Sequence, residues 1–521
     1  MNRLEENQYQ AAISMPTRKA GLIGKSAVIG ASVGLIASLY RFVLMKAETL
    51  SFAVYDYIRS NPVLIPFLFL ALCALGYGVG YLASKYKYIG GSGIPQVKGI
   101  IMGHFEVPWL STLIAKFVGG AASILAGLSL GREGPSIQIG SCVAEGIGNR
   151  LASSRTEKRM LIAGGASAGL AAAFNAPLAG AMFAVEEIFK YISPAILLVT
   201  MVCAVLGDFV SKMVFGVNTV FSFHTPVGIP LKSYWLLLLL GVLLGCMGAL
   251  YNYVLLKTQA LYKSMKRLPP PVRVMIPFVL AGCLGLVFPT VLGGGHAVVT
   301  KLEEPTGLSM LLLIFAVKFL FSMASFGSGA PGGIFFPLLI MGAALGSITG
   351  EFSALYLNVD RSLLNDLIVI SMAGYFAAIV RAPFTGVILL LEMTGSFVNL
   401  LPLVIVSLVA YVVADLLKSR PIYDSLLANQ LAERGCGAKC SRRRKITVET
   451  IVQHGSKAAD QTVKSLTFPK HSLLIAIRRD EEEFIPSGNT LIRPGDYLVF
   501  LLNEEDEAEG RGLLEEITTG H

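Results

Sequence analysis

The stretch KFVGGAASILAGLSLGREGPSIQIG, residues 116–140, recurs in altered form as KFLFSMASFGSGAPGGIFFPLLIMG, residues 318–342. A shift of 202 residues places Lys116 on Lys318 and superposes serine, glycine and proline positions along both stretches. Both stretches are apolar, and both are interrupted by glycine and proline. The chain is therefore predicted to contain two copies of one unit built from broken helices.

Two further pairs of segments extend the duplication. The same shift lays two glycines of GGSG (90–93) on two of GGGH (293–296). A shift of 206 residues lays AAAFNAPLAG (171–180) on AAIVRAPFTG (377–386). Matches that keep the same order along the chain exclude chance similarity between apolar segments. Paired breaks of this kind predict a binding site near the middle of a membrane.

The composition predicts a polytopic α-helical membrane protein. The 521 residues are 54% hydrophobic and 15% charged, against roughly 25% charged in soluble domains. The 54 glycines and a mean hydropathy of +0.65 agree, because glycine is common in transmembrane helices. A soluble protein of this composition would lack a polar surface. Apolar segments are expected at about 21–44, 62–83, 109–130, 160–189, 193–215, 234–256, 273–292, 308–325, 333–350, 366–391 and 400–417.

Charge and cysteine usage fit the same class. The net charge of +9 is explained by lysine and arginine in cytoplasmic loops, and the run 442–445 fits the cytoplasmic exit from the last apolar segment. The chain has no basic domain with interleaved aromatic residues, so binding to a nucleic acid polymer is not predicted. The cysteines predict neither disulfides nor a metal site, since Cys436 and Cys440 stand in a polar linker without nearby histidine. Residues 1–20 are polar, and 21–44 is expected to serve as an uncleaved membrane anchor.

The breaks themselves predict an anion site. Free backbone N–H groups at helix N-termini, with the positive end of the helix dipole behind them, bind anions without a full cationic partner. GGSGIP (90–95) adds the Ser92 hydroxyl, GREGP (131–135) offers several amides, and GGIFFP (332–337) offers those of Ile334 and Phe335. Each break alone could be a plain kink. Three breaks placed in register in a duplicated chain favour a binding site.

These three motifs resemble the signature motifs of CLC chloride channels and transporters, in the family's order. NAPLAGAMFAVEE (175–187) and RPIYDSLL (420–427) extend the resemblance, which covers about residues 20–427. It implies an all-α membrane fold of two inverted-topology repeats, a complete chloride pathway in each subunit, and a homodimer in the lipid bilayer. Nucleotide-binding and catalytic motifs are not found, so an enzyme is not predicted.

The resemblance assigns the chloride-binding groups. The Ser92 and Tyr423 hydroxyls and the Ile334 and Phe335 amides would hold the central chloride. An outer site would lie at the amides of Arg132, Glu133 and Gly134. Serine at position 92 implies chloride as the substrate, because relatives selective for fluoride or nitrate carry other residues there. No cofactor is implied.

The resemblance also assigns the proton groups. Glu133 would be the external gating glutamate, competing with chloride and moving away when protonated. The alternative is that Glu133 only stabilises the N-terminus of its helix by interacting with the helix dipole. Glu187 would be the internal proton-transfer glutamate that marks exchangers, although a salt bridge at an interface is the other use of a carboxylate there. Lys116 would add positive potential behind the pathway. The prediction is a chloride/proton antiporter, with a passive chloride channel as the alternative, and Glu186 is expected to be structural because Glu392 duplicates it.

A soluble module is predicted after the membrane part. Strands at 473–479 and 496–502 are separated by turns, and a short helix follows the acidic residues 504–509. The module resembles the RCK C-terminal (TrkA-C) domain of prokaryotic potassium-transport regulators, some of which bind cyclic di-AMP at a dimer interface. A regulatory ligand or dimer site is therefore expected near Ile475, Ile477, Arg478 and Arg479.

The predicted organisation follows from these segments. The resemblance implies a multi-pass protein of the inner (plasma) membrane of a prokaryote, with the C-terminal domain in the cytoplasm and regulating transport. The expected parts are a cytoplasmic N-terminal segment (1–20), the transmembrane domain (21–427, with repeats at about 21–215 and 234–427), a linker (428–445) and the regulatory domain (446–521).

Overall fold

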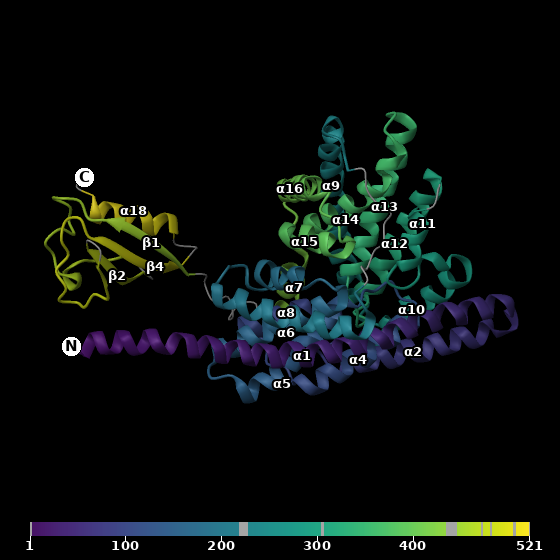
Figure 1. Cartoon of the computed structure of the whole chain (residues 1–521), viewed down its shortest axis with the longest axis horizontal. Helices are drawn as coiled ribbons and strands as arrows, with labels where there is room; N and C mark the ends of the chain where they lie inside the picture. The colour runs from purple at the N-terminus through teal and green to yellow at the C-terminus, as the bar shows by residue number, and fades with distance from the viewer. Residues whose placement is uncertain are drawn as a thin grey trace. The chain divides into compact units, whose positions relative to one another are not determined.

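The structure is a computed structural model of the whole chain, coloured from the N-terminus to the C-terminus in Figure 1. It describes residues 3–217, 228–303, 307–433, 445–469, 472–479, 482–503 and 507–519. The chain forms two compact units, residues 1–427 and 428–521. Cys436 and Cys440 of the predicted linker lie outside the described residues.

The first repeat is a series of helices broken at the predicted motifs. Its elements are α1 (Arg3–Ser60), η1 (Pro62–Leu64), α2 (Ile65–Lys85), α3 (Ile94–Met102), α4 (Trp109–Leu125), α5 (Glu133–Leu151), α6 (Arg155–Phe174), α7 (Pro177–Phe183), the π-helical segment η2 (Ala184–Phe189) and α8 (Pro194–Phe215).

The α-helices of the first repeat recur in the same order in the second, which ends in an additional helix, α17. The elements of the second repeat are η3 (Leu231–Ser233), α9 (Tyr234–Ser264), α10 (Pro270–Val287), η4 (Pro289–Val291), α11 (His296–Glu303), α12 (Leu308–Gly327), α13 (Phe335–Tyr356), η5 (Arg361–Leu363), α14 (Leu364–Val380), α15 (Pro383–Thr394), α16 (Leu400–Leu416) and α17 (Ile422–Glu433).

The helix starts confirm the duplication residue by residue. Shifting the first residues of α3 and α5 by 202 gives the first residues of α11 and α13. Shifting those of α7 and α8 by 206 gives those of α15 and α16. The apolar segments predicted at 160–189 and 366–391 are each divided, because Asn175 and Arg381 take left-handed backbone conformations that end α6 and α14. A proline at the first position of the next helix then restarts the chain.

The lengths and compositions of the helices fit a membrane. Among the described residues, eight helices are long and apolar enough to cross a membrane, and α4, α15 and α16 are shorter apolar helices. α14 and α13 are largely enclosed by the rest of the protein, whereas α2 and α10 are largely exposed. This arrangement is expected when central helices surround a site and outer helices meet lipid.

Small residues allow the central helices to pack closely. α5 packs on α6, and its counterpart α13 packs on α14. A Cβ atom at Gly140 would lie 2.2 Å from the Gly165 carbonyl oxygen, so α5 and α6 meet backbone to backbone. α7 also contacts α15, its equivalent in the other repeat. These contacts bring corresponding breaks of the two repeats together.

The C-terminal unit is a small antiparallel sheet with one helix. The strand order is β1–β4–β2–β3, with β1 (Lys445–Ile451), β2 (Leu473–Arg479), β3 (Glu482–Phe484) and β4 (Tyr497–Asn503). The short turn η6 (Val463–Ser465) lies between β1 and β2, and α18 (Glu507–Thr518) packs on β1 and β4 (Figure 1). The core contains Val448, Ile477, Leu498, Phe500 and Leu514. The segment predicted as a linker begins as helix, since α17 continues to Glu433.

Candidate functional site

Backbone hydrogen bonds join the broken segments of the two repeats. Gly131 and Gly333 exchange two of them, with N···O distances of 2.7 and 2.8 Å. Gly91 accepts a hydrogen bond from the Gly332 amide and donates one to the Gly329 carbonyl. The loops before α3, α5 and α13 are thereby held against one another. Three helices consequently begin in one region, and their first N–H groups have no partner within their own helices.

Two hydroxyl groups lie close to each other in this region, and neither makes a hydrogen bond of regular geometry among the described residues. Ser92 precedes α3 and Tyr423 is the second residue of α17, and both side chains are buried. A Cβ atom at Gly134 would lie 2.4 Å from the Ser92 oxygen, so only glycine allows α5 to begin this close to Ser92. A buried hydroxyl without a partner is costly in a protein interior. The pair marks a position for a ligand that accepts hydrogen bonds.

Aromatic rings enclose the start of α13. The Phe335 ring packs against Phe376, Phe174 and Phe183, with centroid distances of 4.7, 5.2 and 6.1 Å. Ile334 and Phe335 are buried at the first turn of the helix. The low-polarity surroundings strengthen the interaction of these amides with an anion.

Glu133 is the first residue of α5 and is completely buried. Its carboxylate folds back toward its own loop, because a Cβ atom at Gly131 would lie 2.4 Å from Glu133 Oε2 and 3.1 Å from the Phe336 nitrogen. The Arg132 Nε lies 3.7 Å from Glu133 Oε1. Within the described part of the chain, neither carboxylate oxygen accepts a hydrogen bond of regular geometry. The carboxylate therefore lies where helix N-termini would attract any anion.

A small cavity outside Glu133 contains a second carboxylate. Glu48 of α1 lines it together with Arg132, Glu133, Gly294 and Phe336. Glu48 was not predicted from the sequence. No motif marks its position in α1, and the packing of α1 against α5 brings it beside Glu133.

Lys116 and Lys318 occupy equivalent buried positions. The Lys116 ammonium donates to the carbonyl oxygens of Ile89 and Gly91, at 2.8 and 2.6 Å. The Lys318 ammonium donates to those of Val291 and Gly293, at 2.9 and 2.7 Å. These carbonyls are separated by the same shift of 202 residues. Lys116 thus braces the loop that carries Ser92 and does not contact the hydroxyl directly.

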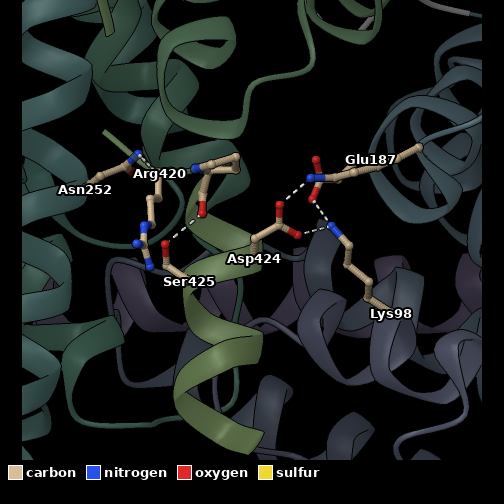
Figure 2. A network of polar contacts seen from close by, with 8 residues as sticks. Lys98, Glu187, Asn252, Arg420, Asp424 and Ser425 are labelled. Carbon is tan, nitrogen blue, oxygen red and sulfur yellow. Dashed lines mark hydrogen bonds and ion pairs between the residues drawn. The ribbon is translucent and has the colours of Figure 1, made fainter. Parts of the chain in front are cut away.

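Glu187 lies in η2 and forms an ion pair with Lys98 of α3 at 3.0 Å. Lys98 also pairs with Asp424 of α17 (Figure 2). Asp424 pairs in turn with Lys190. Lys98 and Asp424 were missed by the sequence reasoning. Asp424 directly follows Tyr423 and Lys98 lies six residues after Ser92, but no spacing rule connects the two.

The predicted structural role of Glu186 is confirmed. Its carboxylate accepts hydrogen bonds from the Phe384 and Thr385 amides at 3.2 and 2.7 Å, at the start of α15. Glu392 accepts reciprocally from the Leu178 and Ala179 amides at 2.9 and 2.8 Å, at the start of α7. Each repeat therefore caps a helix of the other.

The four residues expected to bind a regulator lie in different environments in the soluble unit, and the binding prediction stays a prediction. Ile477 is fully buried in the core, and Ile475 is half-buried at an irregularity in the pairing of β2 with β4. Arg479 forms two hydrogen bonds of 2.7 Å to Asp496. Arg478 pairs with Glu449 at 3.2 Å and covers the Tyr497 ring. Ile477 and Arg479 therefore serve the module's own fold, whereas the Arg478 side chain is partly exposed.

Fold and site together define a polytopic helical membrane protein with an anion-type site at converging helix N-termini. In the described residues, no group of His, Cys, Asp and Glu side chains could hold a metal ion. Residues 75–415 match the family described as voltage gated chloride channel, and residues 447–513 match the TrkA-C domain. The chain therefore belongs to the voltage gated chloride channel (CLC) family and carries a TrkA-C domain.

Similar proteins agree with this assignment. The chain is 33% identical over 441 residues to the H(+)/Cl(-) exchange transporter ClcA of Citrobacter koseri, covering 81% of this chain and 92% of that protein. It is 34% identical over 426 residues to ClcA of Vibrio cholerae, covering 78% and 89%. The crystal structure of a slow cyanobacterial Cl-/H+ antiporter matches with a TM-score of 0.74 and 29% identity, covering 80% of this chain and 99% of that one.

Proposed function

We propose that this protein is a chloride/proton antiporter. The observation that carries the proposal is the presence of two buried carboxylates, Glu133 at the start of α5 and Glu187 in η2. One carboxylate opens toward a cavity with Glu48 and Arg132, and the other belongs to the charge network with Lys98. A chloride pathway needs no second buried carboxylate. An exchanger needs a proton station on each side of the anion site.

Chloride is bound at two positions in this proposal. The central ion accepts hydrogen bonds from Ser92 and Tyr423 and lies at the first amides of α13, from Ile334 and Phe335. Two features support this assignment: the buried hydroxyls make no hydrogen bond of regular geometry among the described residues, and aromatic rings enclose the start of α13. The outer ion lies at the first amides of α5, where Arg132, Glu133 and Gly134 converge.

Glu133 competes with the outer chloride and carries the proton on one side. An ionised carboxylate occupies the position where α5 attracts anions, and a protonated one leaves it. Arg132, 3.7 Å away, favours the occupied state. Lys116 fixes the loop before α3 and adds positive potential behind the pathway.

Glu187 exchanges protons on the other side. The channel alternative would leave a fully buried carboxylate in η2 without a transport role, in an ion pair with Lys98. Retaining a buried ion pair for stability alone is not favoured, because well-packed apolar residues are often equally stable. The exchanger explains why charge is kept at this depth.

Reversal potentials in planar bilayers test the antiporter against the channel. A pH gradient applied at equal chloride concentrations should shift the reversal potential of an exchanger, since every chloride cycle moves protons. The Glu187→Gln variant should respond to the chloride gradient alone. A wild-type reversal potential that ignores the pH gradient supports the channel alternative and refutes the proposal.

The quaternary and regulatory features complete the proposal. We place the protein as a homodimer in the inner membrane of a prokaryote, with the TrkA-C domain in the cytoplasm as a dimerising regulator of transport. The match of residues 447–513 to the TrkA-C domain supports the regulatory part. Cyclic di-AMP is the ligand to test, by calorimetry on the full-length protein. Its binding would use groups other than Arg479, which is held by Asp496.

A further inference from the structure

Four charged side chains form an alternating chain beside the anion site. Glu187 pairs with Lys98 at 3.0 Å, Lys98 pairs with Asp424, and the second Asp424 oxygen pairs with Lys190. Figure 2 shows the carboxylates of Asp424 and Glu187 both directed toward the Lys98 ammonium. The residues come from three elements, α3, η2 with the residue that ends it, and α17.

Exposure rises along this charge chain. The side chains of Lys98 and Glu187 are 0% and 2% exposed, whereas those of Asp424 and Lys190 are 35% and 36% exposed. The network therefore leads from the buried carboxylate to the protein surface.

The charges of the network balance in only one protonation state of Glu187. With Glu187 ionised, two negative and two positive charges alternate. When Glu187 takes up a proton, Lys98 loses one of its two partners and retains Asp424. A buried ammonium without a full complement of partners is costly, so protonation of Glu187 leaves Asp424 as the partner that holds Lys98 and removes the repulsion between the two carboxylates.

Lys98 and Asp424 are each close in sequence to one of the two hydroxyl groups proposed to bind chloride. Lys98 stands one helical turn after Ile94, the first residue of α3, which Ser92 precedes. Asp424 directly follows Tyr423. On the other side of α17, Asn252 donates hydrogen bonds to the Arg420 carbonyl and the Ser419 hydroxyl, at 3.2 and 3.3 Å. Tyr423 is thus held between a neutral anchor on α9 and the charge network.

We propose that Lys98 and Asp424 are positioning residues of the inner proton station, which hold Glu187 and transmit its protonation to the helices that carry Ser92 and Tyr423. This inference rests on the proposed role of Glu187 in proton exchange. The inference links proton exchange at Glu187 to chloride binding. When the Glu187–Lys98 attraction is lost, the charge interactions of Asp424 at the start of α17 change, and Asp424 directly follows Tyr423.

The charged or titratable groups that act on Glu187 are Lys98, Lys190, Asp424 and Tyr423. The two lysines favour the ionised carboxylate, and Asp424 opposes it by repulsion. Replacing Lys98 and replacing Asp424 must therefore shift the protonation of Glu187 in opposite directions. Structural damage would not produce opposite shifts.

The experiment uses full-length protein in proteoliposomes, with proton-coupled chloride exchange measured at equal pH on both faces. Lys98→Met should move the midpoint of the pH profile upward by about 1 to 3 pH units, the usual effect of losing an opposite charge at this distance. Asp424→Asn should move it downward, and by less, because Asp424 is partly exposed. Lys318→Met removes another buried ammonium and should leave the midpoint where it is in the unmodified protein.

Chloride flux in a Glu187→Gln background provides the second readout. If Lys98 acts through Glu187, adding Lys98→Met to this background should leave the pH profile of chloride flux unchanged. Midpoints that stay fixed, or that move in the same direction in both single variants, overturn the inference. An extra shift in the double variant also overturns it. If Lys98→Met yields no folded protein, Asp424→Asn and its combination with Glu187→Gln decide the question.

Failure of the underlying function has a different signature. If unmodified protein moves chloride without protons, the antiporter proposal fails. If unmodified protein is coupled and Glu187→Gln is not, while both positioning variants keep the original midpoint, only the present inference fails.

Discussion

Replacing Glu133 by glutamine should separate chloride movement from proton movement. Glutamine keeps the shape of the protonated side chain and removes the charge that competes with chloride. At an effective dielectric constant of about 20, the ion pair with Arg132 at 3.7 Å is worth about 4 kcal/mol before the cost of desolvation. That attraction is enough to make the carboxylate an effective competitor, and it vanishes in Glu133→Gln.

The pH dependence of chloride flux measures this loss. One bound proton corresponds to 1.36 kcal/mol per pH unit, so a pathway gated by Glu133 can change its flux by up to about tenfold per unit of external pH. Glu133→Gln should vary by no more than about twofold across the same range, with no proton flux. Proteoliposome efflux at a series of external pH values provides the assay.

Glu392→Gln is the matched control for Glu133→Gln. Glu392 is a carboxylate that caps the start of α7 and belongs to neither proton station. Its replacement should lower stability while leaving coupling and the pH slope intact. A Glu133→Gln protein that remains steeply pH-dependent, or that still moves protons against their gradient, refutes the gating role.

Two further predictions concern the transport site, and a third concerns the C-terminal unit. Glu187→Gln should stop proton movement while chloride flux keeps its response to external acid, and intact coupling in flux assays would make Glu187 a structural residue. Tyr423→Phe should weaken chloride binding about tenfold or more in calorimetry, since a hydrogen bond to a charged group is worth about 1.5–3 kcal/mol, and unchanged affinity would remove Tyr423 from the site. Arg479→Met should destabilise the isolated module (428–521) by about 2 kcal/mol in urea unfolding. Burial raises the pKa of Asp496, but hydrogen bonds from Arg479 and from the Arg493 amide outweigh it and hold the pKa below its usual range. This stability should be present above the unfolded-state pKa of about 3.9 and be lost as the pH falls through the lower folded-state value, and equal acid unfolding of both forms would contradict it.

The architecture was predictable because the duplication is written in the sequence. Glycine and proline fix where helices end and begin, so the shift of 202 residues placed the starts of α11 and α13 from those of α3 and α5. The same logic identified Glu186 as structural from its duplicate Glu392. Both features depend on local chemistry repeated in register.

The charge network was not predictable from the same patterns. Lys98 and Asp424 are separated by 326 residues, and only the packed helices bring them together. Glu48 reaches the cavity beside Glu133 through the packing of α1. In the soluble unit, the sequence located the strands but not which faces turn inward, so Ile477 and Arg479 were expected at a surface that they do not form.

The central claim is that chloride and protons move in opposite directions through one protein. The most direct measurement is chloride efflux from proteoliposomes with simultaneous recording of external pH. The account predicts that an outward chloride gradient drives protons into the vesicles against their own gradient. Chloride efflux with no accompanying change in external pH would contradict it.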